Sequence, residues 1–185
     1  MVDPLDELFD RPSRPRVSGH PSAIDPEVLL EQCQMVRGRS GGPGGQHRNK
    51  TETLVELTHT PTGISAHAGE RRSPEANRKR ALKRLRLALA IEHREPVPPG
   101  EARTELWMAR CTKGRIACNR EHADFPAMLS EAMDVLFACG LDAKKAATRL
   151  GCSSSQLVRL IAKHTPAIRR LNRDRRERGM HALRG

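Results

Sequence analysis

Aromatic side chains are scarce in this 185-residue chain, which has three phenylalanines, one tryptophan and no tyrosine. Stacking of single-stranded bases on exposed aromatic rings is therefore not expected. No stretch of about 18 apolar residues occurs, so no membrane contact is predicted. The five cysteines are odd in number and widely separated, which does not indicate a disulfide framework and favours a cytoplasmic location (Cys33, Cys111, Cys118, Cys139 and Cys152).

The first 24 residues also lack an apolar run, and they carry acidic side chains at positions 3, 6, 7 and 10. A secretory signal needs an apolar segment, and a mitochondrial transit peptide is poor in acidic residues, so neither is predicted. We expect residues 1–24 to form a flexible arm.

The net charge of the chain is +11 and its isoelectric point is about 10.3. A surplus of this size points to a polyanionic partner such as nucleic acid or a ribosome. A basic surface that only keeps the protein soluble is the alternative explanation of the charge.

Residues 41–50 read GGPGGQHRNK and form the least regular stretch of the chain. Four glycines and a proline in the first five positions exclude an ordinary helix or strand and suit a loop that approaches another molecule closely. Polar and cationic residues follow, and no carboxylate occurs until Glu52. The loop is therefore predicted to contact an anion with many acceptors, such as a nucleic-acid end.

Three ordered blocks of residues contain this loop and the segments after it. The first is Arg39-x-x-Gly42-x-Gly44-Gly45-Gln46-His47-x-Asn49-Lys50-Thr51, the second is Val55-x-Leu57-x-His59-x-Pro61-Thr62-Gly63-Ile64, and the third is Arg72-Ser73-x-x-x-Asn77-x-x-x-Ala81-Leu82. Together they resemble the Gly-Gly-Gln catalytic domain of class I peptide chain release factors, over about residues 25–93.

The resemblance implies an α+β domain with a small sheet and packed helices. It also implies that this domain hydrolyses the ester of peptidyl-tRNA on the ribosome. It implies that Gly44 and Gly45 adopt conformations closed to larger residues, so that the Gln46 N–H faces the reacting ribose oxygen while its side chain shapes the water pocket. Ribosomal RNA then supplies the remaining groups, no cofactor is needed, and the protein is expected to be a monomer.

Two alternatives for the loop remain. Residues 44–51 differ at one position from a phosphate-binding P-loop, with Asn49 in place of the second glycine, but a strand pattern follows where that motif needs a helix. The other alternative is a domain that binds ribosomes without catalysis. The chain departs from the usual family pattern at Gly41, Arg48 and Pro74, all outside Gly44–Gln46.

The pattern divides the chain into an arm at residues 1–24, the catalytic domain at 25–95, a Pro-rich linker at 96–101, a helical module at 102–165 and a basic C-terminal helix at 166–185. Strands are predicted at 33–38, 53–58 and 63–67, and helices after Asp25 and Ser73 and at 126–139, 143–150, 154–164 and from Pro166. Residues 143–164 resemble a helix-turn-helix unit, which either binds nucleic acid or serves as a plain helical hairpin.

Cationic and polar residues of the loop, the first long helix and the C-terminal helix are the predicted RNA contacts. They are His47, Arg48, Asn49, Lys50, Arg78, Lys79, Lys83, Arg169, Arg170, Arg173, Arg175 and Arg176. The spacing of Cys111, Cys118 and His122 is loosely suggestive of a metal site, but no Cys-x-x-Cys pair supports it, and no metal is predicted.

No segment resembles a stop-codon-reading domain, and the short architecture resembles codon-independent ribosome-rescue hydrolases. We therefore expect a peptidyl-tRNA hydrolase with catalytic residues Gly44, Gly45 and Gln46 and with ribosomal RNA and peptidyl-tRNA as partners. The alternative is a non-catalytic RNA- or DNA-binding protein that uses the helix-turn-helix unit and whose Gly-rich loop only docks.

Overall fold

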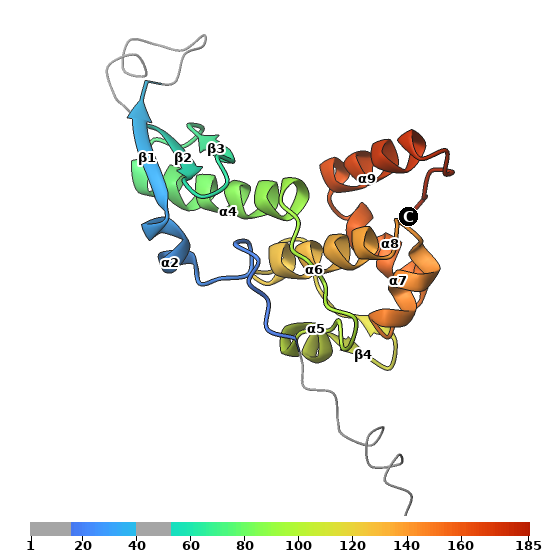
Figure 1. The fold of residues 1–185 in the computed structure, drawn as a ribbon. Helices are drawn as coiled ribbons and strands as arrows, with labels where there is room; N and C mark the ends of the chain where they lie inside the picture. The colour runs from blue at the N-terminus through green and yellow to red at the C-terminus, as the bar shows by residue number, and fades with distance from the viewer. Residues whose placement is uncertain (1–15, 40–52) are drawn as a thin grey trace, which may run out of the picture.

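The computed structural model describes residues 16–39 and 53–185, which form a three-stranded sheet, a short hairpin and seven helices (Figure 1). In chain order the elements are α2 (Pro26–Glu31), β1 (Cys33–Gly38), β2 (Leu54–His59), β3 (Ser65–Ala68), α4 (Pro74–Glu92), α5 (Glu105–Arg110), β4 (Cys111–Thr112), β5 (Arg115–Ile116), α6 (Phe125–Ala138), α7 (Ala143–Arg149), α8 (Ser154–Ala162) and α9 (Thr165–Glu177). The predicted α+β class with a helical C-terminal part is confirmed.

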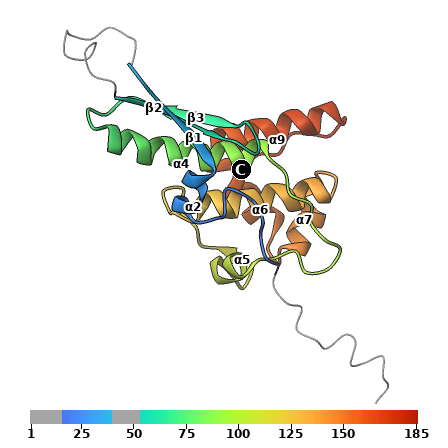
Figure 2. The same ribbon diagram turned by 60° about the vertical axis from the view of Figure 1, so that its left-hand side comes forward.

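The sheet is antiparallel with β2 at its centre, between β1 and β3. Every second side chain of β2 is buried, namely Val55, Leu57 and His59, as the alternation in the sequence predicted. Helix α4 covers the sheet, as Figures 1 and 2 show, and buries Ala81, Leu85 and Leu89 in the same core. Strand β1 is an edge strand, and most of its side chains remain exposed.

Helix α4 begins where the sequence predicted. The Ser73 side chain accepts a hydrogen bond from the Ala76 N–H at 3.3 Å, and Pro74 occupies the first helical position. Serine satisfies an amide that has no partner inside the helix, and proline has no such amide to satisfy. These local interactions depend on neighbours in the chain alone, which is why the helix start could be predicted.

The last turn of α4 enters a second hydrophobic core. Ala90 and Ile91 pack there with Trp107 and Met133, among other residues of the helical part. Helix α4 therefore contributes to both cores, and the predicted linker at 96–101 follows a helix that already joins the two parts. Arg149 also holds this segment, because its guanidinium donates to the Pro98 carbonyl oxygen at 2.6 Å.

Helix α6 is the centre of the helical part, since all its residues from Phe125 to Leu136 are buried. Helices α5, α7 and α8 pack around it (Figure 1). The hairpin β4–β5 was not expected in a module predicted to be all-helical. Its strands have two residues each, too few to show an alternation, and Lys113 and Gly114 turn the chain with φ of 49° and 75°.

Residues 16–24 correct the prediction of a flexible arm for that segment. His20 and Ser22 are fully buried, and the His20 ring Nε2 lies 3.3 Å from the His93 carbonyl oxygen at the end of α4. The Arg86 guanidinium donates to the Ser22 carbonyl oxygen at 3.1 Å. These contacts join residues more than 60 positions apart in the chain, so a local sequence pattern does not predict them. Residues 1–15 lie outside the described residues.

The C-terminal helix α9 is part of the folded body, because Ala167 and Leu171 are fully buried in the second core. Arg175 is also buried, at 7% exposure, and donates hydrogen bonds to the carbonyl oxygens of Leu141 and His181. None of the helices that the structure describes is long and apolar enough to cross a membrane.

Candidate functional site

The Gly-rich loop leaves the sheet at one end of the β1–β2 pair. Gly38, the last residue of β1, pairs with Leu54, the first residue of β2, so both ends of the loop start side by side. The predicted catalytic residues Gly44, Gly45 and Gln46 and the predicted RNA contacts His47, Arg48, Asn49 and Lys50 lie outside the described residues. The structure therefore defines the base of this loop.

Asn77 ties three backbone groups together at this base. Its side-chain Nδ2 donates to the carbonyl oxygens of Thr53 at 2.6 Å and Arg71 at 2.8 Å, and its Oδ1 accepts from the Arg71 N–H at 2.9 Å. The side chain is fully buried. Because Thr53 is the residue at which the chain returns from the loop, Asn77 fixes that point to the start of α4.

Two arginines beside this clamp were not among the predicted RNA contacts. Arg71 and Arg72 are exposed, and within residues 16–39 and 53–185 their guanidinium groups have no ion-pair partner. They directly precede Ser73, the N-cap of α4. Two adjacent arginines before a predicted helix start are the sequence feature that could have indicated them. Their place beside Thr53 puts free positive charge at the base of the loop.

The cations of α4 differ in how far neighbouring carboxylates neutralise them. Arg78 pairs with Glu75 at 3.0 Å and Lys83 pairs with Glu121 at 2.5 Å. Lys79 is exposed and forms no ion pair with the described residues. Of the three predicted α4 contacts, only Lys79 could bind a phosphate without first breaking an ion pair with a carboxylate of the described residues.

The arginines of α9 divide in the same way. Arg170 is held by Glu92 and Asp174, and Arg173 is exposed but lies 3.9 Å from the Asp174 carboxylate. Arg169 and Arg176 are exposed and form no ion pair with the described residues. Arg175 is removed from the candidate contacts, because its buried guanidinium satisfies backbone carbonyls inside the fold. The last 43 residues contain twelve lysines and arginines and two acidic residues, a net +10 out of +11 for the whole chain.

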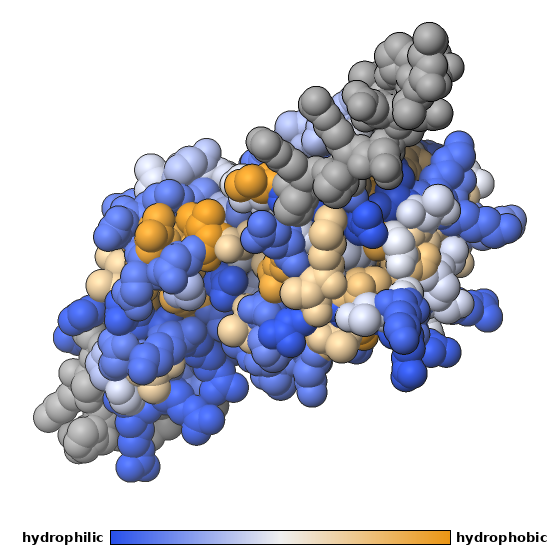
Figure 3. Space-filling view, turned by 90° about the horizontal axis from the view of Figure 1, so that it is seen from below, coloured by the Kyte–Doolittle hydropathy of each residue, from blue (hydrophilic) through white to orange (hydrophobic). Residues whose placement is uncertain are grey.

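The surface seen from below is largely hydrophilic, with hydrophobic patches that stay separate from one another (Figure 3). Exposed large apolar side chains in the described residues include Met35 and Val36 on the edge strand β1, at 43% and 52%. Two neighbouring side chains do not make a broad apolar interface, and the charge distribution is the stronger indication of the partner.

The helix-turn-helix pattern of residues 143–164 is present as α7 and α8. Gly151 turns the chain with φ of 64°, and the Ser153 side chain caps α8 by accepting from the Gln156 N–H at 3.2 Å. The turn is covered, since the Trp107 ring N–H donates to the Leu150 carbonyl oxygen at 2.8 Å and the Gln156 side chain accepts from the Ile116 N–H at 3.3 Å. This packing favours a structural role for the turn.

A buried carboxylate lies beneath the N-terminal segment. Glu131 on α6 accepts hydrogen bonds from the Thr104 N–H at 2.8 Å and the Thr104 hydroxyl at 2.6 Å, and that hydroxyl caps α5 by accepting from the Trp107 N–H. Burial raises the pKa of Glu131 to about 7, although the bonds from Thr104 oppose the shift.

The stability of the protein is therefore expected to depend on Glu131 between pH 4.5 and 7. The folded state binds the proton more tightly than the unfolded state, so ionisation destabilises the fold as the pH rises through this window. Glu131→Gln does not titrate. Relative to that variant, the wild type should lose on the order of 2 to 3 kcal/mol of unfolding free energy between pH 5 and pH 8. Urea denaturation at both pH values measures this, and parallel pH profiles would contradict it.

No group of three or more potential metal-ligating side chains comes together in residues 16–39 and 53–185. Cys111 and Cys118 donate weakly to the carbonyl oxygens of Gly151 and Asn119, and His122 lies beside Arg110 and Asp124. All five cysteines are free thiols.

Comparison with known proteins gives a family. Residues 23–120, just over half of the chain, match the RF-1 domain. Peptide chain release factor 1 of Caldicellulosiruptor saccharolyticus is 47% identical over 66 residues, which cover 36% of this chain and 19% of that protein. Peptide chain release factor 1 of Chloroherpeton thalassium is 51% identical over 66 residues, 36% of this chain and 18% of that protein.

A plant protein, peptide chain release factor PrfB1, chloroplastic, of Arabidopsis thaliana, is 44% identical over 69 residues, 37% of this chain and 15% of that protein. The chain thus spans less than a fifth of the length of each of these relatives. The chain belongs to the RF-1 domain family, in agreement with its resemblance to the catalytic domain of class I peptide chain release factors.

Proposed function

We propose that this protein hydrolyses the ester bond of peptidyl-tRNA on stalled ribosomes without reading a stop codon. The observation that carries the proposal is the Gly44-Gly45-Gln46 sequence within a matched RF-1 domain, in a loop whose two ends are held together by the β1–β2 pair. The ribosome would supply the RNA surroundings of the reacting ester. The free thiols are consistent with action in the cytoplasm.

The chemistry needs few groups from the protein. Gly44 and Gly45 would let the backbone approach the ribose closely, the Gln46 N–H would stabilise the oxygen on which charge develops, and its side chain would position water. A backbone donor does not titrate, so no acid–base residue at the loop is required. Gly44, Gly45 and Gln46 are therefore the proposed catalytic residues, and the proposed RNA contacts in the same loop are His47, Arg48, Asn49 and Lys50.

Codon independence is proposed because the second half of the chain is mostly helical and its last part is strongly cationic. The described residues after the RF-1 match form helices α6–α9, and the last 43 residues of this part carry a net charge of +10. A cationic helical surface suits RNA backbone, which carries charge but little sequence information. The proposed contacts here and on α4 are Lys79, Arg169, Arg173 and Arg176, and the protein is proposed to act as a monomer.

Release of labelled peptide from purified bacterial ribosomes tests the proposal. Three complexes are compared, with a truncated message, an intact message with a sense codon in the decoding site, and a stop codon there. Faster release on the truncated message supports rescue activity. Release on the stop codon alone would contradict codon independence, and no release on any of the three, with binding intact, would contradict the enzyme.

The exposed arginines of α9 are expected to bind the ribosome through phosphates. A deletion from Leu171 would remove a core residue, so substitution is the cleaner test. The triple variant Arg169→Ala, Arg173→Ala, Arg176→Ala should bind ribosomes about tenfold or more weakly at physiological salt, with a shallower dependence of binding on salt concentration. Sedimentation binding at several salt concentrations measures this.

A matched control removes three other exposed cations, with Lys144→Ala, Lys145→Ala and Arg184→Ala. It loses the same net charge. If both triple variants weaken binding equally, the effect comes from overall charge and the assignment to α9 is wrong.

A further inference from the structure

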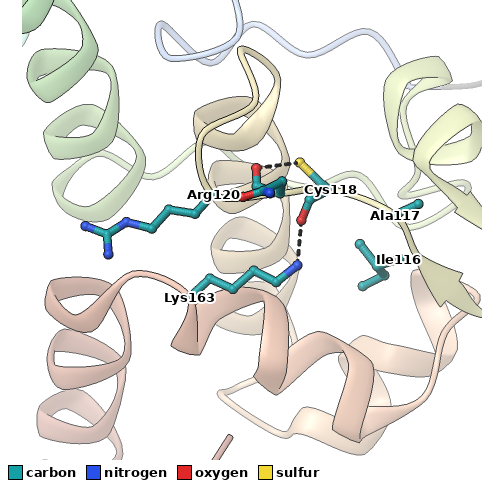
Figure 4. A pocket seen from close by; sticks show the side chains of 6 residues that line it. Ile116, Ala117, Cys118, Arg120 and Lys163 are labelled. Carbon is teal, nitrogen blue, oxygen red and sulfur yellow. Dashed lines mark hydrogen bonds between the residues drawn. The ribbon is translucent and has the colours of Figure 1, made fainter.

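A hollow of about 460 Å³ lies between the segment after β5 and the C-terminal end of α8. It is lined by Ile116, Ala117, Cys118, Asn119, Arg120 and Lys163. Figure 4 shows Lys163 reaching from α8 to the Cys118 carbonyl, with Ile116 and Ala117 beyond it and Arg120 extended away from the other labelled side chains. The hollow is wide open to solvent, so a bound group would lie in a depression of the surface.

The hollow offers hydrogen-bond donors that the described part of the chain does not use. Arg120 is exposed and has neither a hydrogen bond nor an ion pair there. The Asn119 side-chain oxygen accepts from the Glu121 N–H at 3.2 Å, which leaves its NH₂ group available. Lys163 Nζ donates one of its three N–H groups to the Cys118 carbonyl oxygen at 2.5 Å and keeps two for a ligand.

Negative charge close to the hollow is already engaged. Glu121 follows Arg120 in the chain, and its carboxylate pairs with Lys83 on α4. The α8–α9 region beside Lys163 belongs to the strongly cationic last 43 residues. An anion would therefore be attracted to this hollow and would find Arg120 and Lys163 without displacing a carboxylate from either.

The lining has a second kind of surface that a bare anion would not need. Ile116, Ala117 and the nearly buried Cys118 give it an apolar side, next to the free amide of Asn119. A nucleobase has an apolar face and a polar edge, and amide side chains read such edges in single-stranded RNA. Because the chain has few aromatic rings, base binding has to use surfaces of this type.

We propose that this hollow binds one unpaired nucleotide of single-stranded RNA. The base would lie against Ile116 and Ala117 with its edge at the Asn119 amide, and the adjoining phosphates would meet Arg120 and Lys163. The choice of RNA rests on the proposed function, in which the partner is the ribosome. The site itself does not involve the Gly-Gly-Gln loop and can be tested without peptide release.

Fluorescence anisotropy with the full-length protein and a labelled twelve-nucleotide oligouridine tests the site. Arg120→Ala should weaken binding about fivefold or more and reduce the slope of log affinity against log salt, as for one lost phosphate contact. Lys145→Ala removes an exposed cation of α7 outside the hollow, and it should change affinity by about twofold or less. Equal effects of the two variants would overturn the site.

A strand of equal length and charge with abasic ribose at every position separates base binding from phosphate binding. The wild type should prefer oligouridine to the abasic strand by about fivefold or more, and Asn119→Ala should lose most of this preference while keeping its affinity for the abasic strand. Equal binding of both strands by the wild type would mean phosphate contacts only and would overturn the base site.

Crosslinking with 4-thiouridine in the oligonucleotide, followed by mass spectrometry, should label residues 116–120. Crosslinks confined to other segments would contradict the location. A protein that releases peptide but fails these tests retains the proposed function and lacks this site. One that passes them but releases no peptide is an RNA-binding protein, so the two failures are distinguishable.

Discussion

Gly45→Ala is expected to abolish peptide release while ribosome binding stays within about twofold of the wild type. In the proposed mechanism, the added Cβ would exclude the backbone conformation that aims the Gln46 N–H at the reacting oxygen. Removal of one preorganised donor of this kind typically lowers a rate constant by about 100- to 1,000-fold. Binding should persist, because the cations of α4 and α9 are unchanged. Single-turnover release on saturating ribosomes, together with sedimentation binding, measures the two effects separately.

Gly38→Ala is the matched control for this variant. Gly38 ends β1 at the base of the same loop, and a Cβ there would meet the Leu54 side chain at 3.5 Å, an ordinary contact. We expect near-normal release from it. Normal release by Gly45→Ala would show that the proposed catalytic assignment is wrong, and equal loss in both variants would show that the loop tolerates no added carbon at all.

Asn77→Ala is expected to have the largest effect among the described residues. It removes three hydrogen bonds of the buried Asn77 side chain. The Thr53 carbonyl oxygen then lacks this partner in a buried place, and the N–H and carbonyl oxygen of Arg71 lack it in a partly buried one. Each such loss costs about 1 to 3 kcal/mol, so the free energy of unfolding should fall by roughly 3 to 5 kcal/mol. Denaturant unfolding measures this.

The same variant should lower kcat for release by about tenfold or more under conditions where circular dichroism shows it folded. Thr53 is then no longer tied to α4, and a small misplacement at a reacting centre costs much of the rate. KM should change little, since the clamp holds only the backbone of Arg71 and leaves the proposed contacts Lys79, Arg169, Arg173 and Arg176 in place. A kcat equal to that of the wild type in folded Asn77→Ala would contradict a positioning role.

Two further variants sharpen this test. Asn77→Asp keeps the acceptor for the Arg71 N–H but sets a carboxylate oxygen against two carbonyl oxygens, so it should be at least as damaging as alanine. Asn172→Ala breaks a similar side-chain bridge to the backbone of Leu183, far from the loop. It should reduce stability without a specific loss of kcat.

Short-range features of this fold could be read from the sequence. Asp25, Ser73, Asp142 and Ser153 each cap the helix that was predicted to follow them. A helix cap depends on residues two or three positions apart, and the buried face of a strand depends on alternate residues. Both can therefore be predicted from residues that are near one another in the sequence. The family blocks likewise identified the RF-1 domain before any tertiary contact was known.

Which charges are free was decided by tertiary structure. Arg175 and Arg176 are adjacent in a basic run, yet Arg175 is buried against carbonyl groups of Leu141 and His181 while Arg176 is exposed. Lys83 meets Glu121 across 38 positions, and Lys79 meets no carboxylate in the described residues. Composition indicates a polyanionic partner, but distances between remote residues determine which side chains can bind it.

The sequence by itself determined the α+β class, the family, and a Gly-rich loop whose residue types suit contact with an anion such as a nucleic-acid end. Tertiary structure alone showed that α4 belongs to two cores, that residues 16–24 are docked, and that Asn77 anchors the return of the loop at Thr53. The physical reason is the range of the interactions. Backbone propensity and capping act between near neighbours, whereas burial and ion pairing depend on which distant segments the chain brings together.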